Sequence, residues 1–210
     1  MNSKTKKITT IGMLCALAYA LVATIRIPLI LFLEYEPKDV IITIGGLIWG
    51  PFISFLVSSI VSTIEMITIS EDGIYGLIMN ILSSCSFACT AAFIYQKQRK
   101  RSGMILGLLG GYFFMVIVML LWNYLIAPIY MGYPRETVAK LLLPAFLPFN
   151  LIKGGLNTAI IMILYPPILT SLEHSRLAEA PVSSTKRNWL IRILFILAFV
   201  LSALLLYHIV

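Results

Sequence analysis

The sequence predicts an all-α polytopic membrane protein with a six-helix core, whose second helix is short, and a seventh helix at the C-terminus. Composition supports this first, because 60% of the 210 residues are hydrophobic and only 12% are charged. The mean hydropathy is +0.95, whereas a soluble domain carries about 25% charged residues. The apolar residues also gather in long runs, and a spanning helix needs about 20 of them. An ordinary soluble enzyme and a disordered protein are therefore excluded.

The first apolar run covers residues 8–33 and follows a basic flank. It is long and lacks a small-residue cleavage site, so it predicts a membrane helix and not a cleaved signal peptide. The polar stretch EYEPKD at 34–39 ends this run.

The next run, residues 40–49, is too short to cross a bilayer upright and ends at a Gly-Pro turn signal. Its Gly45 and Gly46 indicate a close backbone approach, either to a ligand or to another helix. Charged or turn residues separate the later runs. These cover residues 52–69, 74–95, 104–130, about 141–172 and 189–210.

The chain divides into a membrane domain at 1–175, a polar linker at 176–188 and an additional transmembrane helix at 189–210. Pro144 and Pro148 are expected in the approach to the sixth helix. The C-terminal helix is either a seventh span or an ancillary helix that packs against a partner.

The distribution of basic residues predicts a cell-membrane protein with a cytoplasmic N-terminus. With the predicted spans, eleven Lys and Arg residues fall on the same side of the membrane as the N-terminus, and four fall on the opposite side. No basic stripe is interleaved with aromatic residues, so nucleic-acid binding is not expected. The eleven are Lys4, Lys6, Lys7, Lys97, Arg99, Lys100, Arg101, Arg176, Lys186, Arg187 and Arg192, and the four are Arg26, Lys38, Arg135 and Lys140.

Catalytic chemistry is not indicated. The two histidines, His174 and His208, lie in the linker region and in the last turn. The chain has no HExxH, no phosphate-binding GxxxxGK[ST] loop and no CxxC, so we expect neither an enzyme nor a resident metal or cofactor. Cys15, Cys85 and Cys89 lie within apolar runs and are interpreted as small core residues.

Polar residues inside the apolar runs are the candidates for a binding site. They are Glu65, Asn80, Asn123, Asn150 and Lys153. Glu65 is expected to cap a helix or to pair near the membrane edge. Asn123 either bridges two helices or, with Asn150, offers the donors and acceptors that a planar heterocyclic imide needs.

Lys153 has two interpretations. Asn150 and Lys153 are three residues apart and therefore share one helix face. A lysine inside a membrane helix is costly unless it pairs, reaches the headgroups or meets a polar cavity. It therefore either snorkels to the outer headgroups or donates into a pocket that opens to the outside.

Ala16 and Ala20 form a small-xxx-small pattern in the first run, which allows another helix to approach closely. The pattern is weak by itself, because many spans contain it by chance.

Four longer stretches carry a family resemblance: FLEYEPKDVIITIGGLIWGP, NILSSCSFACTAAFIY, WNYLIAPIYMGYPR and FLPFNLIKGGLN. Over about residues 8–172 the chain resembles the riboflavin-specific substrate-binding (S) subunits of energy-coupling factor (ECF) transporters. The resemblance implies a six-helix protein that takes its vitamin from outside and works with a transmembrane coupling subunit and two ATPases.

The resemblance also implies roles for particular residues. Ala16 and Ala20 would face the coupling subunit, and Asn123, Asn150 and Lys153 would contact the flavin. The loop around 32–39, which includes Phe32 and Leu33, would cover the site. Thr43, Gly46 and Asn80 are added as binding candidates from their positions alone. The helix at 189–210 departs from the family plan.

Two other functions stay open. The chain is alternatively an S subunit for another vitamin or precursor, such as thiamine, biotin or a queuosine precursor. A ligand-free membrane scaffold is the alternative from a different class. Retention of a yellow flavin on purification separates these possibilities.

Overall fold

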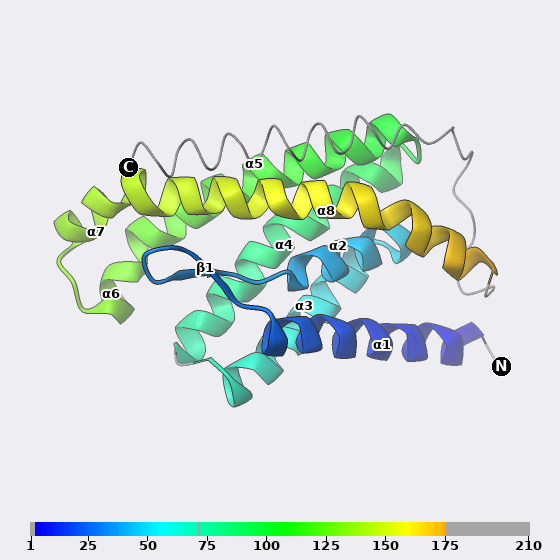
Figure 1. Ribbon diagram of the computed structural model, residues 1–210, viewed down its shortest axis with the longest axis horizontal. Helices are drawn as coiled ribbons and strands as arrows, with labels where there is room; N and C mark the ends of the chain where they lie inside the picture. The colour runs from blue at the N-terminus through cyan, green and yellow to red at the C-terminus, as the bar shows by residue number, and fades with distance from the viewer. Residues whose placement is uncertain (1–2, 71, 175–210) are drawn as a thin grey trace.

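The computed structural model describes residues 3–70 and 72–174. The predicted linker at 176–188 and the predicted helix at 189–210 lie outside these residues. Six helices make up most of the described bundle, and shorter elements join them (Figure 1). The six are α1 (Ser3–Thr24), α2 (Lys38–Trp49), α3 (Pro51–Thr68), α4 (Gly73–Lys97), α5 (Arg101–Leu125) and α8 (Leu147–His174). The shorter elements are β1 (Ile27–Ile30), β2 (Leu33–Tyr35), α6 (Ala127–Met131), α7 (Arg135–Leu141) and the π-helix η1 (Leu142–Phe146).

The segments that connect the long helices lie at two opposite ends of the bundle. In Figure 1 the β1–β2 hairpin, α6, α7 and the α3–α4 connection lie at the left, and we call this the hairpin end. The start of α1, the α4–α5 connection and the last turns of α8 lie at the right. We call this the basic end, because the α4–α5 connection carries Lys97, Arg99, Lys100 and Arg101.

Within the described residues, four helical segments are long and apolar enough to cross a membrane: 51–68, 73–97, 101–125 and 135–172. The last combines α7, η1 and α8. The apolar part of α1, Ile8–Thr24, is shorter. The 12 residues of α2 extend about 18 Å at 1.5 Å each. This is little more than half of a ~30 Å hydrocarbon core, so the prediction of a short second helix is confirmed.

Two predicted runs break where the sequence contains proline. The expected helix over 8–33 is wrong in its last part, because α1 ends at Thr24 and residues 27–30 form a strand instead. Pro28 lacks an N–H group and disfavours helical geometry at the residue before it. The run at 104–130 likewise divides into α5 and α6, with Pro128 in the first turn of α6.

The start of the sixth helix follows the prediction more closely. Pro144 lies in η1, and Pro148 is the second residue of α8. A π-helical turn is a common irregularity within a longer helix, often at a functional site. Here it comes directly before the residues that the sequence singles out as binding candidates.

Small residues allow α4 and α5 to pack closely. A Cβ atom placed at Gly111 would lie 2.4 Å from the Phe87 carbonyl oxygen, and one at Gly107 would lie 2.6 Å from that of Ala91. Helices in a bilayer gain little from hydrophobic burial against each other, so close van der Waals packing stabilises the pair. The resulting core contains residues of α2, α4, α5 and α8, among them Val40, Phe87, Met115 and Ile161.

Candidate functional site

The buried polar side chains at the hairpin end centre on Asp39, in the first turn of α2. Its carboxylate Oδ2 lies 3.3 Å from Lys153 Nζ of α8, and its Oδ1 accepts a hydrogen bond from the Ser84 hydroxyl of α4. Asp39 is only 1% exposed and Lys153 only 7%. An acidic side chain at a helix N-terminus is favourable, and here the same carboxylate also neutralises a buried lysine.

The hairpin is tied to this centre by Tyr35 and Asn157. The Tyr35 hydroxyl donates to Asn157 Oδ1 at 2.8 Å, and Asn157 Nδ2 lies 3.5 Å from Asp39 Oδ2. Burial, together with the nearby Asp39 carboxylate, raises the pKa of Tyr35 above its ordinary value. The phenol therefore stays neutral and keeps the proton that it donates. Strand β2, α2 and α8 are in this way held in one network.

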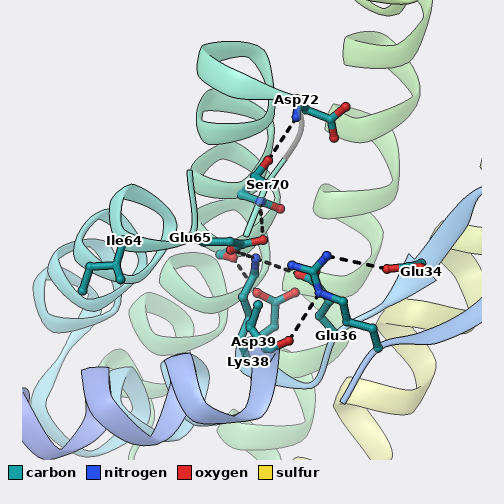
Figure 2. Close-up of polar contacts among 12 residues, drawn as sticks. Glu34, Glu36, Lys38, Asp39, Ile64, Glu65, Ser70 and Asp72 are labelled. Atoms are coloured by element: carbon teal, nitrogen blue, oxygen red, sulfur yellow. Dashed lines mark hydrogen bonds and ion pairs between the residues drawn. The ribbon is translucent and has the colours of Figure 1, made fainter. Parts of the chain in front are cut away.

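A second cluster lies beside the first and joins α2 to α3. Lys38 Nζ lies 2.8 Å from Glu36 Oε2 and also pairs with Glu65 of α3. Figure 2 shows the side chains of Glu36, Lys38 and Glu65 pointing toward one another. Lys38 is fully buried, so its charge depends on these two carboxylates for compensation. Of the two roles expected for Glu65, the structure confirms pairing; its position at the membrane edge stays a prediction.

Lys38 and Asp39 thus hold the start of α2 from two sides. Neighbouring residues on a helix point in different directions. Lys38 points toward α3, whereas Asp39 points toward α4 and α8. Arg26 extends the charged groups outward, because its guanidinium lies 3.6 Å from Glu36 and 3.8 Å from Glu34.

The structure excludes the snorkelling interpretation of Lys153. Its ammonium group is directed to the buried Asp39 carboxylate and not to the membrane surface. Asn150, three residues earlier, is 2% exposed, and its Nδ2 donates to the Phe146 carbonyl at 2.8 Å. Asn123 is 3% exposed and donates in the same way to the Met119 carbonyl. An asparagine amide has a second N–H and an oxygen acceptor besides.

Three further predicted residues make contacts within the helices. Asn80 Nδ2 donates to Glu65 Oε1 at 3.1 Å and so belongs to the Lys38 cluster. Thr43 is fully buried, and its hydroxyl donates to the Asp39 carbonyl. A Cβ atom at Gly46 would lie 1.8 Å from Ser54 Oγ and 3.1 Å from the Ala92 Cβ. The close approach at Gly46 is therefore to α3 and α4, the second of the two alternatives left open by the sequence. Ligand contact at these three positions stays a prediction.

The remaining predicted residues lie at two separate places. Phe32, in the turn of the hairpin, makes an edge-to-face contact with Phe146, with 6.3 Å between the ring centroids. Leu33 packs against the small cluster that includes Phe146. Ala16 and Ala20 are both exposed on α1 and are not part of the hairpin-end network.

Several residues of the network were not singled out from the sequence as polar contacts. Asn157 shares a helix face with Asn150 and Lys153, at i+7 and i+4, and this spacing is the signal that would have found it. Tyr35, Lys38 and Asp39 fall in a stretch that was predicted only as a covering loop. No sequence spacing relates them to α8, because the contact depends on how the helices pack.

The described residues contain no group of three His, Cys, Asp or Glu side chains that could hold a metal ion. Fold and site together define a multi-pass membrane protein in which the buried charged side chains of the described residues, Lys38, Asp39, Glu65 and Lys153, lie together, as expected of the binding component of a transporter. Residues 6–165 match the family described as "ECF transporter, substrate-specific component". The chain belongs to this family, and it is a transport component, not an enzyme.

Individual relatives agree with the family. The chain is 28% identical to the "Riboflavin transporter FmnP" of Bacillus subtilis over 188 residues, which cover 84% of this chain and 98% of the relative. It is also 28% identical to the "Riboflavin transporter RibU" of Staphylococcus aureus over 169 residues, covering 76% and 88%. A solved structure described as "Structure and mechanism of the S component of a bacterial ECF transporter" matches with a TM-score of 0.69 and 27% identity, covering 81% of this chain and 99% of that one.

Proposed function

We propose that this chain is the riboflavin-binding subunit of an ECF-type importer. Both relatives described above are riboflavin transporters by name. The observation that carries the proposal is the buried face of α8, where Asn150 and Lys153 lie together while Asp39 compensates the charge of the lysine. A site whose charge is already balanced suits an uncharged ligand, and riboflavin is uncharged.

The polar groups supplied by Asn123, Asn150 and Lys153 suit the imide edge of the flavin ring, which alternates acceptor, donor and acceptor. An asparagine amide both donates and accepts, and an ammonium group adds donors. Most of the affinity is expected from apolar burial of the ring, with these few groups fixing its orientation. Phe32 and Leu33 would lie over the site from the hairpin.

We propose further that the N-terminus is cytoplasmic and that the hairpin end faces outward. The start of α1 and the basic α4–α5 connection lie at the same end of the bundle (Figure 1), which is consistent with one side collecting the positive charge. Uptake then needs a transmembrane coupling subunit and two ATPases, because the sequence contains no phosphate-binding loop. Membrane-impermeant labelling of single cysteines placed at residue 99 and at residue 34 tests this orientation: only the residue 34 variant should react in intact cells.

The function itself is tested with the purified full-length chain. We expect protein from flavin-rich cells to be yellow and to quench riboflavin fluorescence in a stoichiometric titration after the ligand has been removed. Thiamine and biotin serve as competitors that should not displace the flavin. Colourless protein with no fluorescence change on titration would overturn the proposal, and displacement by thiamine or biotin would assign a different vitamin.

A further inference from the structure

Trp122 of α5 carries a buried hydrogen-bond donor that has no acceptor among residues 3–70 and 72–174. Its indole Nε1 is shielded from solvent and is one of three such side-chain atoms in this part of the chain, the others being the hydroxyls of Ser58 and Ser62. A buried indole N–H normally has a partner. A serine hydroxyl rotates to suit a neighbour or a water, whereas the indole N–H direction is set by the ring. Of these three unpaired groups, the Trp122 indole N–H therefore gives the strongest indication of a missing acceptor.

The Trp122 ring lies on the core side of α5. Trp122 follows Met119 by three residues and Met115 by seven, so the three side chains share one helix face. Both methionines are buried, at 6% and 1% exposure. Trp122 packs against the cluster to which they belong, and this cluster is shared by α2, α4, α5 and α8. The indole is thus directed into the bundle and not to lipid.

The same cluster includes residues from the helices that carry the proposed site. Val40 of α2 is a buried member of the cluster, and Leu151 of α8 packs against it. Asn123, the next residue after Trp122, is 3% exposed. The unpaired donor consequently lies in the apolar core between α2, α4, α5 and α8, the helices that also carry Asp39, Asn80, Asn123, Asn150 and Lys153.

We propose that the Trp122 indole N–H donates a hydrogen bond to an acceptor atom of the bound flavin, a ring nitrogen or a carbonyl oxygen of the isoalloxazine. This inference rests on the function proposed above. The oxidised ring system has two carbonyl oxygens and two unsubstituted imine nitrogens as acceptors, against a single N–H donor. An indole is a donor only and therefore complements this excess of acceptors. Trp122 is in this way a ligand contact beyond the asparagines and the lysine.

The test compares the full-length wild-type chain with a Trp122→Phe variant and with a protein in which Trp122 is replaced by 3-benzothienylalanine. The second replacement keeps the shape of the indole and exchanges its N–H for sulfur. We expect both variants to bind riboflavin about five- to fiftyfold more weakly in a fluorescence titration, because an acceptor on the ligand loses its partner in a dry site. Trp49→Phe is the matched control, since Trp49 packs against a separate cluster formed by residues of α1, α2, α3 and α4; the affinity of this variant should be unchanged.

Ligand-free stability separates a binding role from a structural one. The benzothienylalanine protein should melt at the wild-type temperature or above without riboflavin, because an unpaired donor has been removed. Wild-type affinity in this protein would overturn the inference, as would a fall in ligand-free melting temperature with unchanged affinity. If the Trp122→Phe variant fails to fold, the riboflavin affinity of the benzothienylalanine protein alone tests the inference. Absence of riboflavin binding by the wild-type chain would instead overturn the proposed function, and this inference with it.

Discussion

Lys153 and Asp39 are separated by more than half of the described chain, yet the lysine Nζ lies 3.3 Å from the aspartate Oδ2 in the interior of the bundle. The pair joins the sixth long helix to the first turn of α2. It also changes what a mutation of the lysine is expected to do. Removing Lys153 leaves a buried carboxylate without its cation, and this is costly in a region of low dielectric.

Lys153→Met should therefore affect both stability and binding. We expect a loss of about 2–4 kcal/mol in stability, moderated by the hydrogen bonds that Ser84 and Asn157 donate to Asp39. Flavin affinity should fall about ten- to a hundredfold if the ammonium donates to the ligand. The double variant Lys153→Met/Asp39→Asn should recover most of the stability but not the affinity. Thermal melts and fluorescence titrations measure the two quantities, and wild-type affinity in the double variant would show that Lys153 is not a ligand contact.

Glu65→Leu should destabilise the protein through Lys38. The lysine is fully buried and would retain only Glu36 as a close carboxylate. The expected loss is about 2–4 kcal/mol, seen as a lower melting temperature. The double variant Lys38→Met/Glu65→Leu should recover much of this loss, because no buried charge is left unpaired. Glu136→Leu is the control, since Glu136 is exposed on α7. An unchanged melting temperature in Glu65→Leu would show that Glu36 alone compensates the lysine.

Gly46→Ala should destabilise the chain by steric overlap. The new methyl group would lie 1.8 Å from Ser54 Oγ, and overpacking of this kind costs about 1–3 kcal/mol. Ser54→Ala in the Gly46→Ala background removes the nearest atom and should restore part of the stability. Gly12→Ala is the control, because a Cβ atom there has no neighbour within 4 Å. A stable Gly46→Ala variant that has lost flavin affinity would favour the alternative in which Gly46 faces the ligand.

Ala16→Trp and Ala20→Trp should reduce uptake without reducing binding. Both alanines are exposed on α1, and a bulky side chain there would hinder close approach of the coupling subunit. Uptake is measured in vesicles that contain the coupling subunit and both ATPases, and binding is measured on the isolated chain. Leu106→Trp provides a control on the exposed side of α5. Equal losses of uptake and affinity in the alanine variants would contradict their assignment to the partner surface.

The sequence by itself determined the class of protein and most of the helices. Long apolar runs specify membrane helices, because a helix satisfies its own backbone hydrogen bonds where water is absent. The short α2 was predicted from its length, and Asn123, Asn150 and Lys153 were selected because polar groups are rare and costly in such runs. These are local properties, and a single sequence records them directly.

Only the tertiary structure decided which polar groups meet. The end of α1 depended on Pro28 and on the pairing of 27–30 with 33–35, which a hydropathy run does not reveal. The partners of Lys153 and Lys38, and the link from Tyr35 to Asn157, join segments far apart in the chain. Such contacts depend on helix crossings and on the direction of each side chain. A buried charge must find a counter-charge, but which one lies within reach is determined by packing.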